Sequence, residues 1–239
     1  MKNRTCNARE FLLESPWMQS LGAAVQERVI AEAYDILHRE GDIVARQGEP
    51  VCSWIGVAEG LLKVVGGVST SRPVIYSSVP VGSWMGEGSV IKNEPRLYDV
   101  IAIGGTRTIH VPRATFRWLL ESSFEFNHFV ISHLNERLGQ FMSMVETTRI
   151  DDPMVRLARA LVGLFNPVLY PKTSAVLTVS QQELGDLAGI TRQRTNAALQ
   201  VLKRLGMIEI RRGAIVVLDL PALKALSRSS SLLDAPSAY

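Results

Sequence analysis

Cysteine is almost absent from the sequence, because only Cys6 and Cys52 occur among its 239 residues. Two thiols cannot complete a four-cysteine zinc or iron–sulfur site within one chain. A disulfide between them is unfavourable in a reducing compartment. We therefore expect two free thiols, no metal and no iron–sulfur cluster, and the composition leaves any other cofactor unknown.

Long apolar runs are missing as well. Nowhere do eighteen apolar residues follow one another, which argues against a transmembrane helix. The N-terminal segment MKNRTCNAREFLLESPW lacks the apolar stretch of a signal peptide. We expect a cytoplasmic protein that does not enter a membrane.

The sequence also lacks the usual signatures of catalysis. It has no glycine-rich phosphate loop, no paired carboxylates at a useful spacing and no nucleophile elbow. Its four histidines are scattered without a motif, which disfavours haem ligation by them. These absences argue against an enzyme.

Positive charge is present but unevenly distributed. The net charge is +3, yet residues 1–152 carry 15 basic against 18 acidic residues, whereas residues 153–228 carry 11 against 4. A basic C-terminal third is typical of a nucleic-acid-binding module. On charge alone, a merely soluble basic surface remains open.

Residues 36 to about 112 show short apolar runs separated by turn signals. Glycine recurs at these corners, as in Glu40-Gly41-Asp42, Gln47-Gly48-Glu49, Glu59-Gly60, Gly66-Gly67, Pro80-Val81-Gly82 and Gly104-Gly105. A spacing of about ten residues between turns favours an antiparallel barrel or jelly roll. Such a fold encloses an interior that is either packed solid or holds a small ligand.

From about 114 to 149 the apolar residues recur at steps of three and four, which predicts one long helix with an apolar seam. A parallel homodimer would cover this seam, although a helix packed only on its own barrel is the alternative. The expected dimer interface consists of Phe126, Phe129, Val130, His133, Leu134, Leu138, Phe141 and Val145.

A second region begins after Asp151. Asp152 is a good helix cap and Pro153 a good first helical residue, so a helix is expected over 153–165. The loop over 166–175 that follows, with Tyr170 and Lys172 expected to be exposed, either touches RNA polymerase or is only a connector. We expect a hinge between the two regions here.

The segment after residue 179 predicts a helix-turn-helix. Ser180 and Glu183 form a capping box, Gly189 ends the first helix, and Thr191 caps the second. Residues 207–217, with a basic tip at Arg211-Arg212-Gly213, predict a hairpin that acts as a wing, and Asp219 and Pro221 start a last short helix.

The second helix carries its long polar side chains within an arc of about 100°. Arginine pairs with guanine edges, glutamine and asparagine pair with adenine edges, and lysine holds phosphates. A merely solvated face is the alternative. The residues expected to bind double-stranded DNA are Ser180, Gln181, Thr191, Arg192, Gln193, Arg194, Asn196, Gln200, Lys203, Arg211 and Arg212.

Over roughly residues 12 to 226 the sequence closely resembles the Crp/Fnr family, which includes the cyclic-AMP receptor protein. The resemblance rests on several motifs that occur in the family's order. They are Gly41-Asp42, Gln47-Gly48-Glu49, Glu59-Gly60-Leu-Leu-Lys63, Gly86-Glu87, the long helix, and the run LTVSQQELGDLAGITR over 177–192.

The resemblance implies an α+β protein that regulates transcription as a homodimer on a palindromic operator. It implies a cyclic-nucleotide-binding-like sensor barrel (12–122, an antiparallel jelly roll), a dimerisation helix (123–150) and a winged helix-turn-helix (151–228). RNA polymerase is the further partner it suggests. A module that binds an effector and acts on a protein partner instead of DNA is the alternative function.

The sequence departs from the cyclic-AMP-binding members in the sensor. Gly86-Glu87 matches the family's ribose contact, and Arg96 matches its phosphate contact. Leu97 and Tyr98, however, replace a serine and a small residue, and Phe141 and Met142 replace hydroxyl residues of the long helix. A buried anion without its donors binds poorly. We therefore expect a small effector other than cyclic AMP, at Glu87, Arg96, Leu97, Tyr98, Phe141 and Met142.

The recognition helix departs as well. Arg192, Gln193 and Ala197 stand where members that recognise TGTGA-like half-sites carry arginine, glutamate and a later arginine. Glutamate accepts from cytosine N4, whereas glutamine pairs with adenine. We therefore expect a different operator base pair at the position that Gln193 reads.

Overall fold

The structure is a computed structural model that describes residues 8–67, 74–211 and 213–229. The chain divides into two compact units. The first unit comprises residues 1–136 together with the segment 168–172. The second comprises residues 137–167 and 173–239. Cys6 and Arg212 lie outside the described residues.

The first unit begins with three short helices that the sequence analysis did not predict: α1 (Ala8–Glu14), α2 (Pro16–Gln19) and α3 (Ala23–Glu32). Pro16 supplies the first residue of α2, a position where its missing N–H costs nothing. The helices bury Phe11, Leu12, Trp17 and Met18. They therefore cover part of the unit's core.

An antiparallel sheet follows. Its strands are β1 (Tyr34–His38), β2 (Ile43–Ala45), β3 (Ser53–Gly66), β4 (Val74–Pro80), β5 (Trp84–Met85) and β6 (Asp99–Pro112), with α4 (Glu87–Lys92) between β5 and β6. The order is β1-β6-β3-β4, while β2 also pairs with β6 and β5 with β3. The long strands β3 and β6 thus run through both halves of the sheet, with β4 and β2 in one half and β5 and β1 in the other.

Two expected turns lie within strands instead. Glu59-Gly60 falls inside β3 and Gly104-Gly105 inside β6. The β3–β6 register shifts on both sides of Glu59, so the strand bends there without ending. Gly60 has a φ of +82°, and a β-carbon on it would lie 2.5 Å from Thr106 Oγ1. Gly60 therefore permits β3 to bend without ending. As a result, β3 and β6 are each longer than the short strands that were predicted.

Two hydrophobic clusters stabilise the first unit. The smaller one gathers aliphatic side chains of the sheet such as Val57 and Val100. The larger one joins sheet residues to helices and includes Trp17, Trp54 and Trp84. The Trp54 and Trp84 rings stack with centroids 4.2 Å apart. These tryptophans are therefore part of the packed core.

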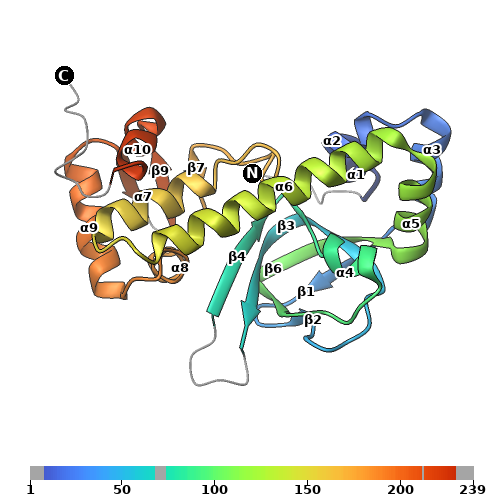
Figure 1. The fold of residues 1–239 in the computed structure, drawn as a ribbon, viewed down its shortest axis with the longest axis horizontal. Helices are drawn as coiled ribbons and strands as arrows, with labels where there is room; N and C mark the ends of the chain where they lie inside the picture. Colours follow the sequence, from blue (N-terminus) through green and yellow to red (C-terminus); the bar gives the residue numbers. More distant parts are fainter. Residues whose placement is uncertain (1–7, 68–73, 212, 230–239) are drawn as a thin grey trace. The chain divides into compact units, whose positions relative to one another are not determined.

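The predicted long helix is two helices. α5 (Arg113–Ser122) and α6 (Phe124–Thr147) are separated at Ser123. The Ser123 backbone N–H still donates to Leu119 O, and its hydroxyl oxygen accepts from the Phe126 N–H at 3.1 Å. Ser123 therefore ends one helix and caps the next. α6 itself runs without a break for 24 residues (Figure 1).

The second unit contains the remaining elements after α6. They are α7 (Pro153–Gly163), β7 (Val176–Leu177), α8 (Gln181–Ala188), α9 (Arg192–Arg204), β8 (Ile208–Arg211), β9 (Ala214–Val217) and α10 (Leu220–Ser227). The predicted caps are confirmed: Asp152 Oδ1 accepts from the Met154 N–H, and Asp219 Oδ1 accepts from the Ala222 N–H, both at 2.8 Å. The hairpin of β8 and β9 is the predicted wing, and β7 pairs with β9.

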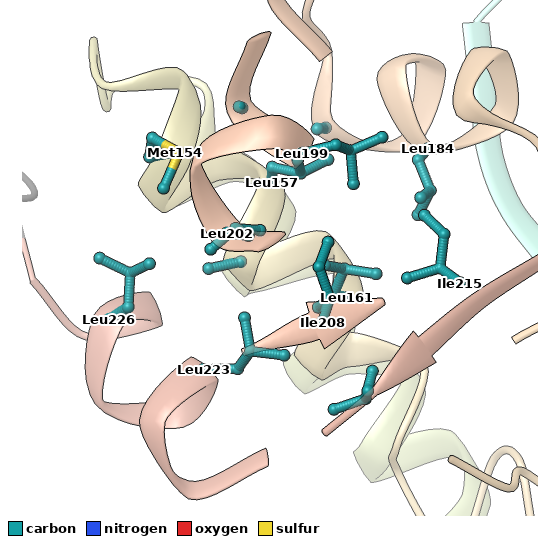
Figure 2. Packing of buried hydrophobic residues seen from close by; sticks show 14 of the residues in the cluster. Met154, Leu157, Leu161, Leu184, Leu199, Leu202, Ile208, Ile215, Leu223 and Leu226 are labelled. Carbon is teal, nitrogen blue, oxygen red and sulfur yellow. The ribbon is translucent and has the colours of Figure 1, made fainter. Parts of the chain in front are cut away.

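One hydrophobic core holds the helices of the second unit together. Figure 2 shows Leu157 and Leu161 of α7 beside Leu199 and Leu202 of α9, with Leu223 of α10 below them. All five side chains are fully buried. At about 25 cal/mol per Å² of apolar area, this burial is the main force that fixes α9 against α7.

The segment 168–172 belongs to the first unit, although the residues on both sides of it belong to the second. Leu169 and Tyr170 are buried, and Lys172 forms an ion pair with Glu14 of α1. The Lys172 ammonium also lies 5.6 Å from the centre of the Phe11 ring. The expectation that Tyr170 is exposed is therefore wrong, because apolar burial and this ion pair anchor the segment.

Candidate nucleic-acid interface and effector site

The predicted helix-turn-helix is present with its caps. Ser180 Oγ accepts from the Glu183 N–H at 3.1 Å, and Glu183 Oε2 accepts from the Ser180 N–H at 2.6 Å. α8 ends at Ala188, and its C-terminal cap Gly189 has a φ of +62°. Thr191 Oγ1 then accepts from the Arg194 N–H at 3.4 Å at the start of α9. Two residues, Gly189 and Ile190, therefore separate the end of α8 from the cap of α9.

A close approach between α8 and α9 sets how these helices cross. A β-carbon on Gly185 would lie 2.5 Å from Thr195 Oγ1. Thr195 is fully buried, and its hydroxyl donates to Thr191 O at 3.0 Å. The role of Gly185 was not predicted from the sequence. Its signal is a glycine inside a helix, which otherwise costs stability.

The two faces of α9 differ completely. Thr195, Ala198, Leu199 and Leu202 are buried. The side chains expected to contact DNA from this helix are all exposed: Arg192, Gln193, Arg194, Asn196, Gln200 and Lys203. The helix is therefore anchored by one face and presents long polar side chains on the other.

The remaining residues expected at DNA lie at the ends of neighbouring elements. Ser180 and Thr191 are exposed caps, and Gln181 is half-buried at the start of α8. Arg211 is in the wing, where its guanidinium donates to both carboxylate oxygens of Glu209, at 3.1 and 2.8 Å. This bidentate pair raises the pKa of Arg211 and lowers that of Glu209. It holds the Arg211 side chain along the wing.

The candidate effector site begins at α4 in the first unit. Gly86 has a φ of +90° and precedes Glu87, the first residue of α4. The Glu87 side chain is buried, and its Oε1 lies 3.6 Å from Nε2 of His133 on α6. His133 is only 2% exposed. The carboxylate that was expected to contact a ribose therefore lies beside a histidine of the same chain.

Arg96, the expected phosphate contact, is 4% exposed. Its Nη2 donates to Ser53 O at 2.7 Å and its Nη1 to Gly86 O at 3.3 Å. A β-carbon on Gly86 would overlap the guanidinium, so glycine is required for this approach. Burial lowers the pKa of Arg96. Two of its nitrogens are therefore already bonded to backbone carbonyls.

A chain of polar side chains continues from Ser53. Ser53 Oγ lies 2.8 Å from Nδ1 of His110, whose Nε2 lies 2.8 Å from Thr108 Oγ1. Thr108 Oγ1 also lies 2.9 Å from Nε2 of His38. Burial lowers the pKa of His110 to about 4, so this imidazole is neutral near pH 7. This network was not predicted, because it joins residues that are far apart in the chain.

Among the other expected effector residues, only Tyr98 carries a hydroxyl group. Leu97 is 60% exposed, and the Tyr98 ring packs edge-on against Tyr76. Phe141 and Met142 belong to the second unit, and both are exposed. Arg96 thus donates to two backbone carbonyls, and leucine stands at the position where the cyclic-AMP-binding members carry a serine hydroxyl.

Three residues of the expected dimer interface are wrongly assigned. Phe126, Val130 and His133 are buried within the first unit, where the first two belong to the core that contains the tryptophans. Phe129 packs against the same core and is half-buried. The helix periodicity was correct, but one stripe of it already contacts the chain's own sheet and helices.

The exposed stripe of α6 is the other part of the expected interface. Its predicted members Leu134, Leu138, Phe141 and Val145 are exposed, as are two that were missed, Phe124 and Ile131. Phe124, Ile131, Leu138 and Val145 are each seven residues apart, and Leu134 and Phe141 repeat the same interval. A seven-residue repeat of two apolar positions is the pattern of a coiled-coil seam.

Metal-binding clusters and membrane spans are both missing from the described residues. These residues contain no group of three or more histidine, cysteine or acidic side chains able to hold a metal ion. Among the helices of this described part, none has the length and apolar character needed to cross a bilayer.

The fold defines a class of protein. It combines an antiparallel sensor-type sheet, a long helix with an apolar stripe and a winged helix-turn-helix, which is the arrangement of regulators that join a ligand-binding-type domain to a DNA-binding domain. Residues 37–123 match the family model described as "Cyclic nucleotide-binding domain", and residues 155–226 match "Crp-like helix-turn-helix domain". The chain belongs to the Crp/Fnr family of DNA-binding transcription regulators. No curated protein sequence matches it significantly.

Solved structures share the fold. FixK2 from Bradyrhizobium japonicum aligns with a TM-score of 0.70 and 18% identity, over 82% of this chain and 98% of its own. TTHA1359, a CRP/FNR-family transcriptional regulator from Thermus thermophilus, aligns with a TM-score of 0.60 and 23% identity, over 82% and 100%. CLP, a c-di-GMP responsive global regulator from Xanthomonas campestris, aligns at 0.58 and 21%, over 83% and 100%. The predicted fold class and family are confirmed.

Proposed function

We propose that this regulator binds a palindromic DNA operator as a homodimer and reads base edges with the N-terminal half of α9. The observation that carries the proposal is the exposed polar face of α9 opposite its fully buried one. A compact domain has no internal need for five long polar side chains on one arc of the helix, at Arg192, Gln193, Asn196, Gln200 and Lys203, whereas the major groove offers partners to each of them.

The exposed stripe of α6 supports the homodimer. Six apolar side chains at coiled-coil spacing would otherwise remain in water, at a cost of about 25 cal/mol per Å². Two copies joined in parallel along this stripe would present two α9 helices related by twofold symmetry, and such an arrangement requires a symmetric operator.

We propose an effector other than cyclic AMP for the first unit. The support is the geometry of Arg96, which donates to Ser53 O and Gly86 O, together with Leu97 at the serine position. The Xanthomonas campestris relative is described as c-di-GMP responsive, so the fold serves other ligands as well.

RNA polymerase is the further partner that we propose, on the grounds of family membership. The buried Tyr170 does not contribute to that contact. We propose that the protein acts in the cytoplasm and that it carries out no catalysis.

The decisive experiment is an unbiased selection of DNA sites from a random pool by the full-length protein, with and without candidate effectors. We expect a symmetric motif whose half-sites lie about one helical turn apart, or a multiple of it. If the DNA recovered with the protein shows no enriched motif, the protein does not read sequence. If the protein retains no DNA at all, the result instead favours a module that acts on a protein partner.

A further inference from the structure

An arginine of α7 contacts the turn of the helix-turn-helix. Arg156 Nε donates to Ala188 O at 2.9 Å, and its Nη2 donates to Gly189 O at 2.7 Å. Ala188 is the last residue of α8, and Gly189 is its C-terminal cap. One edge of a single guanidinium thus holds two consecutive carbonyls of the turn. All these residues belong to the second unit.

The chemistry of this contact is favourable at a helix end. The last carbonyls of a helix have no partner within the helix, and a cation there also offsets the negative end of the helix dipole. The planar guanidinium presents its N–H groups in a fixed fork, so both bonds form without much loss of side-chain freedom. A lysine ammonium cannot reproduce that fork.

Gly189 makes the contact possible in two ways. Its φ of +62° suits glycine, and a β-carbon on it would lie 2.5 Å from Arg156 Nη2. The turn is therefore shaped both to reverse the chain and to receive the arginine. This leaves the link from α8 to α9 held on one side by the Gly185–Thr195 approach and on the other by Arg156.

We propose that Arg156 is a positioning residue for DNA recognition, which fixes from α7 the angle at which α9 leaves the turn. Arg192 and Gln193 follow Gly189 by only three and four residues, so slack in the turn displaces them directly. Hydrogen bonds to base edges require close alignment, whereas attraction to phosphates tolerates displacement. Loss of Arg156 therefore lowers specificity more than it lowers general DNA affinity. This inference rests on the proposed base-reading role of α9.

The test compares the full-length variants Arg156→Met and Arg156→Lys with the control Arg159→Met. Arg159 lies on the same helix and carries the same charge, but it donates to Ser227 O at 2.8 Å and pairs with Glu146, away from the turn. Affinities for the selected operator and for random DNA are measured over a range of salt concentrations, and thermal unfolding is followed in parallel.

We expect Arg156→Met to weaken operator binding about tenfold while random DNA changes little, with an unchanged slope of log affinity against log salt. Arg156→Lys should fall between Met and wild type, and Arg159→Met should keep the ratio of operator to random affinity. Hydrogen exchange of the amides over 190–194 should be faster in Arg156→Met at temperatures where the protein remains folded.

Three outcomes would overturn the inference. A salt slope that falls by about one unit per protomer would make Arg156 a direct phosphate contact. An unchanged ratio of operator to random affinity, or an equal loss in Arg159→Met, would reduce its role to general stability. If the wild-type protein itself shows no preference for the operator over random DNA, the proposed function is overturned. This result is obtained with the wild type alone, so it is distinguished from a failure of the Arg156 inference.

Discussion

Arg96 donates to the backbone carbonyl of Ser53 across 2.7 Å, and the hydroxyl of the same serine lies 2.8 Å from His110. A residue at the start of β3 therefore connects the expected phosphate-binding arginine to a neutral histidine. Both partners are buried.

The first prediction concerns cyclic AMP. Because the Arg96 guanidinium already donates to two carbonyls and Leu97 offers no hydroxyl, we expect no tight binding of this nucleotide. Isothermal calorimetry on the full-length protein should give no affinity in the micromolar range, and operator binding should not require the compound. A dissociation constant of micromolar or below would refute the prediction.

The second prediction concerns pH. An unfolded histidine binds its proton near pH 6.5, whereas folded His110 does so only at about 4. The stability that the neutral His110 contributes is therefore fully present above pH 6.5. It is lost progressively as the pH falls towards 4. At pH 5 this loss is about 2 kcal/mol for one such group.

The matching variant is His110→Gln, which keeps an amide for the hydrogen bonds to Ser53 and Thr108. Urea unfolding followed by tryptophan fluorescence reports on the first unit, because all four tryptophans lie in it. Between pH 7 and 5 the wild type should lose about 2 kcal/mol more than the variant. Equal losses would show that His110 does not titrate differently on unfolding.

The third prediction concerns the dimer. Leu138 is exposed near the middle of the seven-residue repeat on α6, so Leu138→Glu should place two carboxylates at the seam and produce monomers at micromolar concentration. Ser143→Glu, on the other side of the same helix, is the matched control and should remain dimeric. Sedimentation or light scattering measures both. A stable folded wild-type monomer would rule out this interface.

The fourth prediction concerns Gln193, an exposed residue in the first turn of α9. Gln193→Ala should weaken operator binding by about 1–3 kcal/mol and relax the preference at one base pair in each half-site. Binding to a library of single-base operator variants measures this. An equal loss on operator and random DNA would show that Gln193 does not read a base.

The fifth prediction concerns Lys203, three turns further along the same exposed face. The far end of a recognition helix approaches the DNA backbone, so Lys203→Ala should weaken all sequences alike. The slope of log affinity against log salt should fall by about one unit per monomer. A change confined to one base pair would instead make this lysine a reader.

The features that local chemistry determines could be predicted from the sequence. The caps at Asp152, Ser180 and Thr191 each depend on a donor two or three residues away, and all three form as expected. The buried face of α9 follows from its 3.6-residue periodicity in the same way.

What depends on distant partners could not be predicted. The orientation of Arg96 is set by Ser53, 43 residues earlier in the chain. On α6, the stripes through Phe126 and Ile131 have the same apolar spacing in the sequence. The fold of the first unit buries Phe126 and leaves Ile131 exposed, and the spacing alone does not distinguish them. The helices α1 to α3 carry too few periodic positions to be recognised.

The segment 168–172 makes the chain cross between the two units three times, at 136/137, 167/168 and 172/173. No single cut of the polypeptide therefore yields either unit intact. A fragment that begins at residue 151 would carry Leu169 and Tyr170 without the side chains that bury them, and Lys172 without Glu14. Such a fragment would gain apolar surface that the whole protein does not have, and its aggregation or altered DNA affinity would reflect the cut and not the removal of a sensor.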